Sequence, residues 1–184
     1  MKNNIDFNFI SVLEGSSKVG YVPKPDGGKI ESGVTIASGF DIGQYSIKQI
    51  MDAFYPSLAN KLVCYAGITG YTAMDALQKK PLYITDDECK CINEFSHNNA
   101  VSYLLDDWKK ATDIEFCDLP EQMQTVIASV AFQYGDLPTR CPNFWKQAVR
   151  EDWNGMYKNL MNFGDDFETR HHKEASKLLE GMNK

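Results

Sequence analysis

Three side chains in the first quarter of the chain have the types that acid–base chemistry requires: Glu14, Thr35 and Asp41. Glu14 follows a helical stripe of apolar residues and stands directly before Gly15. A helix C-terminus carries partial negative charge, which favours a neutral carboxyl over a carboxylate at that end. If burial in a cleft adds to this effect, Glu14 keeps its proton near neutral pH and can donate it to a leaving group. The spacing alone also fits a solvated glutamate at a helix end.

Thr35 and Asp41 lie in the segment ESGVTIASGFDIGQ, residues 31–44, which is rich in glycine and has no helical pattern. Thr35 stands in a β-type alternation, and an aspartate between glycines is typical of a turn. In a functional interpretation, the Asp41 carboxylate activates a water molecule, and the Thr35 hydroxyl, both donor and acceptor, holds that water. The glycines would then let the backbone and a ligand approach closely.

Two acids on opposite sides of a ligand are the minimum for glycoside hydrolysis. One protonates the leaving oxygen, and the other attacks the sugar or activates water. The pattern is not specific, since the chain has 25 acidic residues. Other chemistries find less support, because no Lys-Ser or Lys-Thr follows the glycines as in a phosphate-binding loop, and no G-x-S-x-G motif is present.

The five cysteines are irregularly spaced, which is typical of reduced thiols in a protein made in a reducing cytosol. Cys89-x-Cys91 is poorly spaced for a zinc site, and the His171-His172 pair lies far along the chain. Nothing in the placement of cysteine and histidine favours a nucleophilic pair. We therefore expect neither a metal nor an organic cofactor.

The charge and the apolar runs exclude further classes. A net charge of −6 argues against a general binder of nucleic acid or of anionic membranes. No run approaches about 18 apolar residues, so we expect no signal peptide and no membrane span. The protein is then made in the cytoplasm, and another device must carry it if it acts elsewhere.

The order of patterns predicts an α+β fold that is mostly α. A helical stripe over residues 4–14 precedes a small β-containing lobe at about 15–45, and a helical lobe follows at about 46–184. Within the helical lobe, Thr85 and Glu88 form a capping box for a long helix, and the apolar positions of LPEQMQTVIASVAFQYG predict a deeply buried helix. We expect one domain, 1–184, with the ligand site in a cleft between the lobes.

The motifs FISVLEG, GYVP and SGVTIASGFDIGQ, in this order, resemble the muramidase domain of pesticin and its relatives among antibacterial effectors and phage endolysins. The stretch VIASVAFQYG and the residues that follow it to about 180 resemble the helical lobe of phage-type lysozymes. The resemblance implies a lysozyme fold that cleaves the β-1,4 bond between N-acetylmuramic acid and N-acetylglucosamine in peptidoglycan without a cofactor.

The resemblance also implies roles for individual residues. Glu14 takes the place of the general acid, Thr35 that of the threonine and Asp41 that of the aspartate. The order Glu, Thr, Asp resembles pesticin, because aspartate precedes threonine in phage lysozymes proper. Asp26, which an alignment to phage lysozymes would choose instead, stands in the turn signature KPDGG and is expected in a loop.

Four more residues are candidates for substrate binding or positioning. Arg170 lies where lysozyme relatives place an arginine near the catalytic glutamate, and Tyr21 belongs to the GYVP motif. Gln133 and Tyr134 end the buried helix and are expected to line the cleft. Ordinary packing is the alternative for Arg170, Gln133 and Tyr134.

These patterns predict a peptidoglycan hydrolase, an antibacterial toxin or effector or else a phage endolysin, with bacteriolytic activity. Electrostatic steering to the anionic wall does not fit a net charge of −6, so we expect delivery into the periplasm by a secretion system or a phage-type route. The expected partners are glycan strands and an immunity protein, with the chain itself a monomer. The alternatives are a lysozyme-fold chitinase or chitosanase and a non-catalytic glycan-binding domain.

Overall fold

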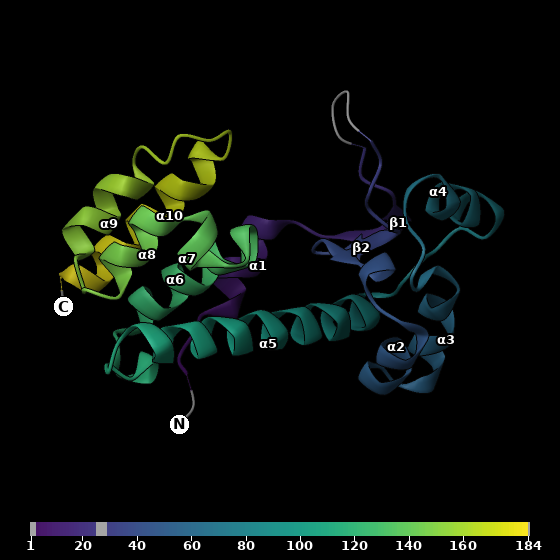
Figure 1. The fold of residues 1–184 in the computed structure, drawn as a ribbon, viewed down its shortest axis with the longest axis horizontal. Helices are drawn as coiled ribbons and strands as arrows, with labels where there is room; N and C mark the ends of the chain where they lie inside the picture. Colours follow the sequence, from purple (N-terminus) through teal and green to yellow (C-terminus); the bar gives the residue numbers. More distant parts are fainter. Residues whose placement is uncertain (1–2, 25–28, 184) are drawn as a thin grey trace. The chain divides into compact units, whose positions relative to one another are not determined.

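The computed structural model describes residues 3–24 and 29–183, so Asp26 lies outside the described residues. The chain divides into two compact units (Figure 1). The sheet unit comprises Glu14–Ser96, and the helical unit comprises Met1–Leu13 together with His97–Lys184. Two helices continue through the boundaries between them, α1 (Phe7–Glu14) and α5 (Asp86–Ala111). The predicted fold class, α+β and mostly α, is confirmed.

The sheet has three antiparallel strands in the order β1 (Ser17–Tyr21), β2 (Thr35–Ala37) and β3 (Phe40–Asp41). In the β2–β3 pair, Thr35 stands opposite Asp41. The turn between these strands is tight, since Ala37 has a φ of 54° and Gly39 a φ of 92°. An alanine in the left-handed region is uncommon, and its backbone is strained.

Helices of the sheet unit pack on the same core as the strands. They are η1 (Ile42–Gln44), α2 (Ile47–Ala53), α3 (Pro56–Leu62), η2 (Val63–Tyr65) and α4 (Gly70–Lys79). Val34, which precedes β2, and Ile36 of β2 share one cluster with Leu58 of α3 and Ile92 of α5, and all four side chains are fully buried. The sheet unit therefore continues to Ser96 rather than ending near residue 45, because these helices have no separate core.

Two capping boxes fix helix starts in this unit, and the sequence predicts the second of them. Ser46 and Gln49 cap α2 reciprocally. The Thr85 amide donates to Glu88 Oε2 at 2.8 Å, and the Glu88 amide donates to Thr85 Oγ1 at 3.2 Å. Each box satisfies backbone amides that a helix N-terminus leaves without partners.

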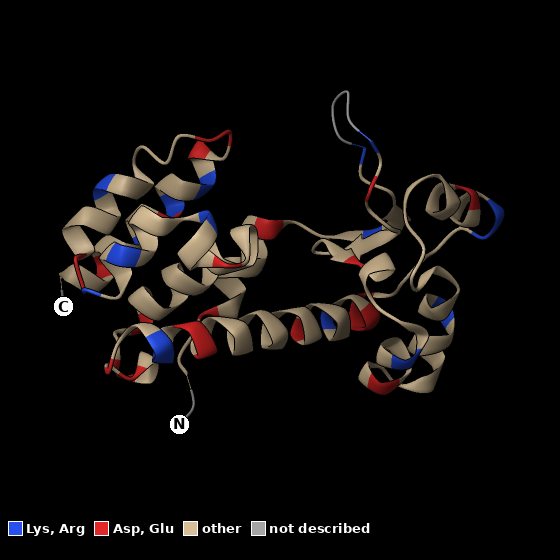
Figure 2. Ribbon diagram, viewed as in Figure 1, with Lys and Arg blue, Asp and Glu red and all other residues tan. Residues whose placement is uncertain are grey.

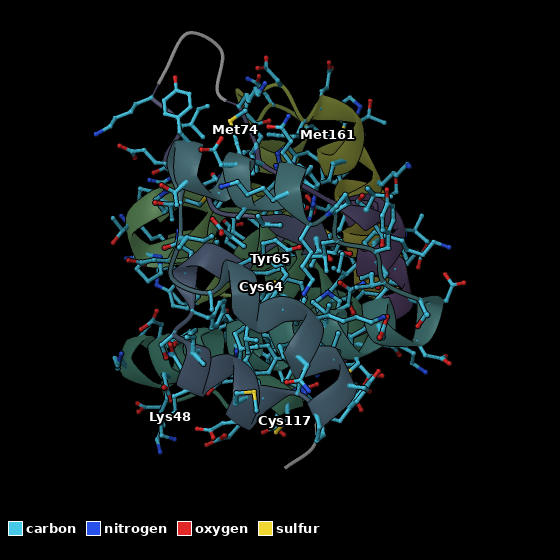
Figure 3. The ribbon with its side chains drawn as sticks, turned by 90° about the vertical axis from the view of Figure 1, so that its right-hand side faces the viewer. Lys48, Cys64, Tyr65, Met74, Cys117 and Met161 are labelled. Atoms are coloured by element: carbon cyan, nitrogen blue, oxygen red, sulfur yellow. The ribbon has the colours of Figure 1, made fainter. Side chains whose placement is uncertain are left out.

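Tyr65 is among the largest fully buried side chains of the sheet unit. Its hydroxyl donates to the carbonyl of Lys80 and so ties η2 to the end of α4. Burial, together with the neighbouring Cys64, raises the pKa of Tyr65 to about 12. Figure 3 labels Tyr65 beside Cys64, which is exposed, and shows Lys48 reaching outward from α2.

The helical unit is built around α6 (Glu121–Tyr134). Every residue from Gln122 to Ala131 is buried, as the sequence predicts for this helix. Gly135, with a φ of 75°, ends it. The surrounding elements are η3 (Phe116–Asp118), α7 (Leu137–Arg140), α8 (Pro142–Ala148), α9 (Trp153–Leu160) and α10 (Glu168–Met182).

Buried polar side chains of α6 anchor the N-terminal segment of the chain. The amide of Asn4 donates to Gln124 Oε1 at 2.8 Å, and the amide of Asp6 donates to Thr125 Oγ1 at 2.9 Å. The Asp6 carboxylate accepts from the Phe9 amide at the start of α1 and from Lys177 Nζ. These hydrogen bonds lower the pKa of Asp6. The start of α1 is thereby fixed on α6.

A second polar cluster joins α6 to α10. Arg170 donates through Nη2 to the Ser129 carbonyl at 2.9 Å and through Nε to Glu174 Oε1 at 3.1 Å. Ser129 Oγ also donates to Glu174 Oε1. Ser129 and Glu174 are fully buried, so a Glu174 carboxylate without these partners would destabilise the fold.

His171 completes this cluster. Its Nδ1 lies 2.8 Å from Glu174 Oε2, its Nε2 lies 3.1 Å from Asp165 Oδ2, and Tyr134 OH lies 3.1 Å from the same nitrogen. The ring of Phe163 stacks on it with a centroid distance of 4.1 Å. Burial lowers the pKa of His171, but the hydrogen bonds to Glu174 and Asp165 outweigh that effect and raise it above 6.5.

Charged residues of both signs occur in each unit (Figure 2). No helix within the described residues is both long enough and apolar enough to cross a bilayer.

The raised pKa of His171 makes the stability of the helical unit depend on pH. The imidazolium stabilises the fold fully below the unfolded pKa of about 6.5, and this contribution is lost as pH rises through the folded value. Between about pH 6 and 9 we expect the unfolding free energy to decrease, and His171→Gln removes this decrease. Urea unfolding followed by tryptophan fluorescence measures it, since Trp108, Trp145 and Trp153 all belong to this unit.

His172→Gln is the matched control, because that neighbouring side chain is 40% exposed. A decrease that is equal in wild type and in His171→Gln would contradict the assignment to His171.

Candidate functional site

Glu14 lines a pocket of about 490 Å³ that lies within the sheet unit. This volume is in the range of small-ligand sites. The lining comes from the end of α1 and the residues after it, from β1, and from the turn between β2 and β3. The residues are Glu14, Gly15, Ser16, Ser17, Val19, Gly20, Tyr21, Ala37, Ser38 and Gly39.

The end of α1 presents Glu14 to this pocket. Glu14 is the last residue of the helix and is half-buried. Gly15 follows with a φ of 66°, the left-handed conformation that commonly ends helices. The helix end predicted from the sequence is thus confirmed, and it places a carboxyl where the carbonyl ends of the helix also point.

Tyr21 lies on the same pocket, on β1. Its side chain is 42% exposed, and Val19 on the same strand is 50% exposed. Exposed apolar surface beside a carboxyl suits a ligand with both apolar faces and polar groups. The structure therefore brings Glu14 and Tyr21, two of the residues predicted for the site, to one pocket.

Thr35 and Asp41 form a second group, on the central and the last strand. Their Cα positions are paired across the β2–β3 ladder. Thr35 is 3% exposed, and its hydroxyl donates to the Gly33 carbonyl at 3.3 Å. Neither residue is part of the lining of the Glu14 pocket.

The Asp41 carboxylate holds the backbone around it. It accepts from the Gly33 amide at 3.1 Å, from the Gly43 amide at 2.9 Å and from Gln44 Nε2 at 3.3 Å. This is the turn arrangement that its glycine neighbours indicate. A carboxylate has about four acceptor positions, so three donors leave space for about one more, such as a water molecule.

Glycines 33 and 43 face each other under this carboxylate. A Cβ on Gly33 would lie 2.5 Å from Asp41 Oδ1 and 2.6 Å from Gly43 Cα. A Cβ on Gly43 would lie 2.5 Å from the carbonyl oxygen of Ile68. These two glycines therefore permit close approach of backbone to backbone, whereas the sequence suggested close approach to a ligand.

Arg170, Gln133 and Tyr134 lie together in the helical unit. Arg170 is engaged by Ser129 and Glu174, as described above. Gln133 Nε2 donates to Tyr134 OH at 3.2 Å. Gln133 Oε1 is the buried side-chain polar atom that has no hydrogen-bond partner within the described residues. Such an orphaned acceptor beside a polar cluster is suited to bind a water or a ligand donor.

Sequence reasoning missed several residues of these groups. Ser38 stands in a turn and has no signal of its own in the sequence. His171 and Glu174 do have one, because Arg170 to Glu174 is an i, i+4 pair and His171 to Glu174 an i, i+3 pair on one helix.

All five cysteines are free thiols. Among the described residues, no group of three or more His, Cys, Asp and Glu side chains is placed to hold a metal ion.

The hydrogen bonds of Asp41 predict that it stabilises the sheet unit. Asp41→Ala leaves the Gly33 and Gly43 amides without their acceptor, and we expect it to reduce the unfolding free energy by about 1–3 kcal/mol. Asp52→Ala is the control, since Asp52 is exposed and pairs only with Lys48 among the described residues. Urea unfolding followed by far-UV circular dichroism measures both, and equal stability of the two variants would contradict a structural role for Asp41.

Residues 4–154 match the model of the Pesticin family, described as a bacterial toxin homologue of phage lysozyme, C-term. The chain belongs to the Pesticin family. The matched range contains the Glu14 pocket, Thr35 and Asp41, and it ends before Arg170. No curated protein matched the chain. Membership in the Pesticin family supports a lysozyme-like fold and a peptidoglycan hydrolase in general, with glycoside hydrolase activity.

Proposed function

We propose that this chain is a muramidase that cleaves the β-1,4 bond between N-acetylmuramic acid and N-acetylglucosamine in peptidoglycan. The observation that carries the proposal is a carboxyl at the end of α1, in a pocket of ligand size, within a range that matches a family of phage lysozyme homologues. General acid–base catalysis needs such a carboxyl and no metal.

In this proposal, Glu14 protonates the glycosidic oxygen as the bond to the leaving sugar breaks. The half-buried position limits the competing access of water to the carboxyl. Tyr21 and Val19 offer apolar surface to the sugar rings that flank this bond.

Asp41 takes the part of the base. Its carboxylate is oriented by Gly33 and Gly43 and retains about one acceptor position, to which an attacking water donates. Thr35, its cross-strand partner, supplies a hydroxyl that orients the same water. The β2–β3 pairing and the close approach of Gly33 and Gly43 hold Thr35 and Asp41 in place. Fixed distances between reacting groups increase the rate of catalysis.

We further propose an antibacterial role, as a toxin or effector or as a phage endolysin. The protein is made in the cytoplasm and acts in the periplasm on glycan strands, after delivery by a secretion system or a phage-type route. It acts as a monomer and is neutralised in the producing cell by an immunity protein. The family description as a bacterial toxin homologue supports the toxin branch of this proposal.

The role of Glu14 is tested by Glu14→Gln. This change keeps the size of the side chain but removes the proton that is donated, so we expect peptidoglycan hydrolysis to decrease by at least about 100-fold. The melting temperature should stay that of wild type. A zymogram with purified peptidoglycan and a turbidity assay measure the loss.

Glu31→Gln is the matched control, because Glu31 is an exposed glutamate of the same unit. A Glu14→Gln variant that clears the gel like wild type would remove the assignment.

The bond that is cleaved is tested by mass spectrometry of digested peptidoglycan. A muramidase releases muropeptides whose reducing end is N-acetylmuramic acid, and we expect these products from wild type and not from Glu14→Gln. Hydrolysis of chitin or chitosan without release of muropeptides would favour a lysozyme-fold chitinase or chitosanase. Binding to peptidoglycan without turnover by the wild type would favour a glycan-binding domain.

A further inference from the structure

The two residues directly after Glu14 are held by side chains from other parts of the sheet unit. Ser38 Oγ, from the turn between β2 and β3, donates to the carbonyl of Gly15 at 2.8 Å. Ser16 Oγ lies 3.0 Å from Cys89 Sγ on α5. Glu14 lines the pocket, and these two contacts hold the residues that follow it in the chain.

Ser38 is in turn held by α5. Its amide donates to Asn93 Oδ1 at 3.0 Å. Asn93 and Cys89 are four residues apart on the helix, and Asn93 Nδ2 lies 3.9 Å from Cys89 Sγ. Residues at this spacing share one helix face. One face of α5 therefore supports both the β2–β3 turn and the segment after Glu14.

The backbone of the turn is strained in a way that serves this contact. Ala37, immediately before Ser38, has a φ of 54° and is 2% exposed, and Gly39 immediately after has a φ of 92°. A left-handed alanine persists only where its surroundings determine the conformation. Here the strained turn directs the Ser38 hydroxyl to Gly15 and the Ser38 amide to Asn93.

The residue that follows Glu14 is a glycine, which leaves the backbone at this place free to rotate unless it is held. Gly15 is in the left-handed region, and a Cβ on it would meet no atom within 4 Å. A glycine in open space gives the chain a pivot directly beside the carboxyl. Proton transfer to a glycosidic oxygen depends on small displacements, so a pivot at this place would cost rate unless another group restrains it.

We propose that Ser38, oriented by Asn93, is a positioning residue that restrains Gly15 and so fixes the Glu14 carboxyl for proton transfer. The proposal rests on the proposed function, in which Glu14 is the general acid. It assigns to the strained turn a part in the rate of catalysis rather than in the binding of substrate.

The experiment compares Ser38→Ala, Ser38→Thr and Asn93→Ala with wild type on solubilised glycan strands. We expect Ser38→Ala to lower kcat by roughly 10- to 100-fold with KM unchanged, because substrate contacts are kept while the Gly15 carbonyl beside the acid loses its hydrogen bond. Ser38→Thr retains the hydroxyl and restores kcat. Asn93→Ala resembles Ser38→Ala, and the double variant is no slower than the slower single variant, since both act through one contact.

Ser96→Ala is the matched control. Ser96 lies on α5, as Asn93 does, and among the described residues its hydroxyl donates only to the Ile92 carbonyl of the same helix. We expect wild-type kcat and KM from it. A Ser38→Ala variant with wild-type kcat, or one in which KM rises while kcat is kept, would overturn the proposal. So would a loss that Ser38→Thr does not restore.

A second measurement separates this proposal from the proposed function. Carbon-13 relaxation of the Glu14 side chain reports its motion whether or not the protein hydrolyses peptidoglycan. We expect greater motion in Ser38→Ala than in wild type and in Ser96→Ala. If the wild type shows no hydrolysis, the proposed function fails. The relaxation data then still show whether Ser38 restrains the Glu14 side chain. Equal motion in all three proteins would overturn the restraint itself.

Discussion

The arrangement of the sheet unit depends on the hydrogen bonds that the Asp41 carboxylate accepts. This carboxylate accepts from backbone amides on both sides of the β2–β3 hairpin and lies against a pair of glycines whose backbones almost touch. A side chain at either glycine would separate the strand ends from η1 and from the loop at Ile68. The same bonds that hold the hairpin also orient the carboxylate, so a structural and a chemical role for Asp41 require the same geometry.

In the helical unit, two groups of buried polar residues hold neighbouring segments in place on α6. Gln124 and Thr125 fix the segment before α1, and Ser129 with Arg170, His171 and Glu174 fixes α10 on α6. Gln124, Thr125 and Ser129, which anchor the two groups, lie on successive turns of α6. Buried hydrogen bonds determine the positions of neighbouring elements more strictly than apolar packing does. If a neighbouring element shifted, buried polar groups would lose their partners.

The sequence predicts those features that have a local cause. Gly15 indicates the end of α1, Thr85 with Glu88 indicates the start of α5, and the glycines around Asp41 indicate its turn. The extent of the sheet unit has no local cause. The apolar patterns of α2, α3 and α4 show that each helix buries one face, but not which core receives it, and residue 96 lies within a continuous helix. The pairing of Ser38 with Gly15 likewise joins residues whose proximity depends on the hairpin.

The helical unit is discontinuous in sequence, and this has a consequence for synthesis. Residues up to Leu13 are synthesised before the sheet unit, but the residues that hold this segment, Gln124, Thr125 and Lys177, follow more than a hundred positions later. The sheet unit is continuous and can complete its core as it emerges, whereas the N-terminal segment must wait for α6 and α10.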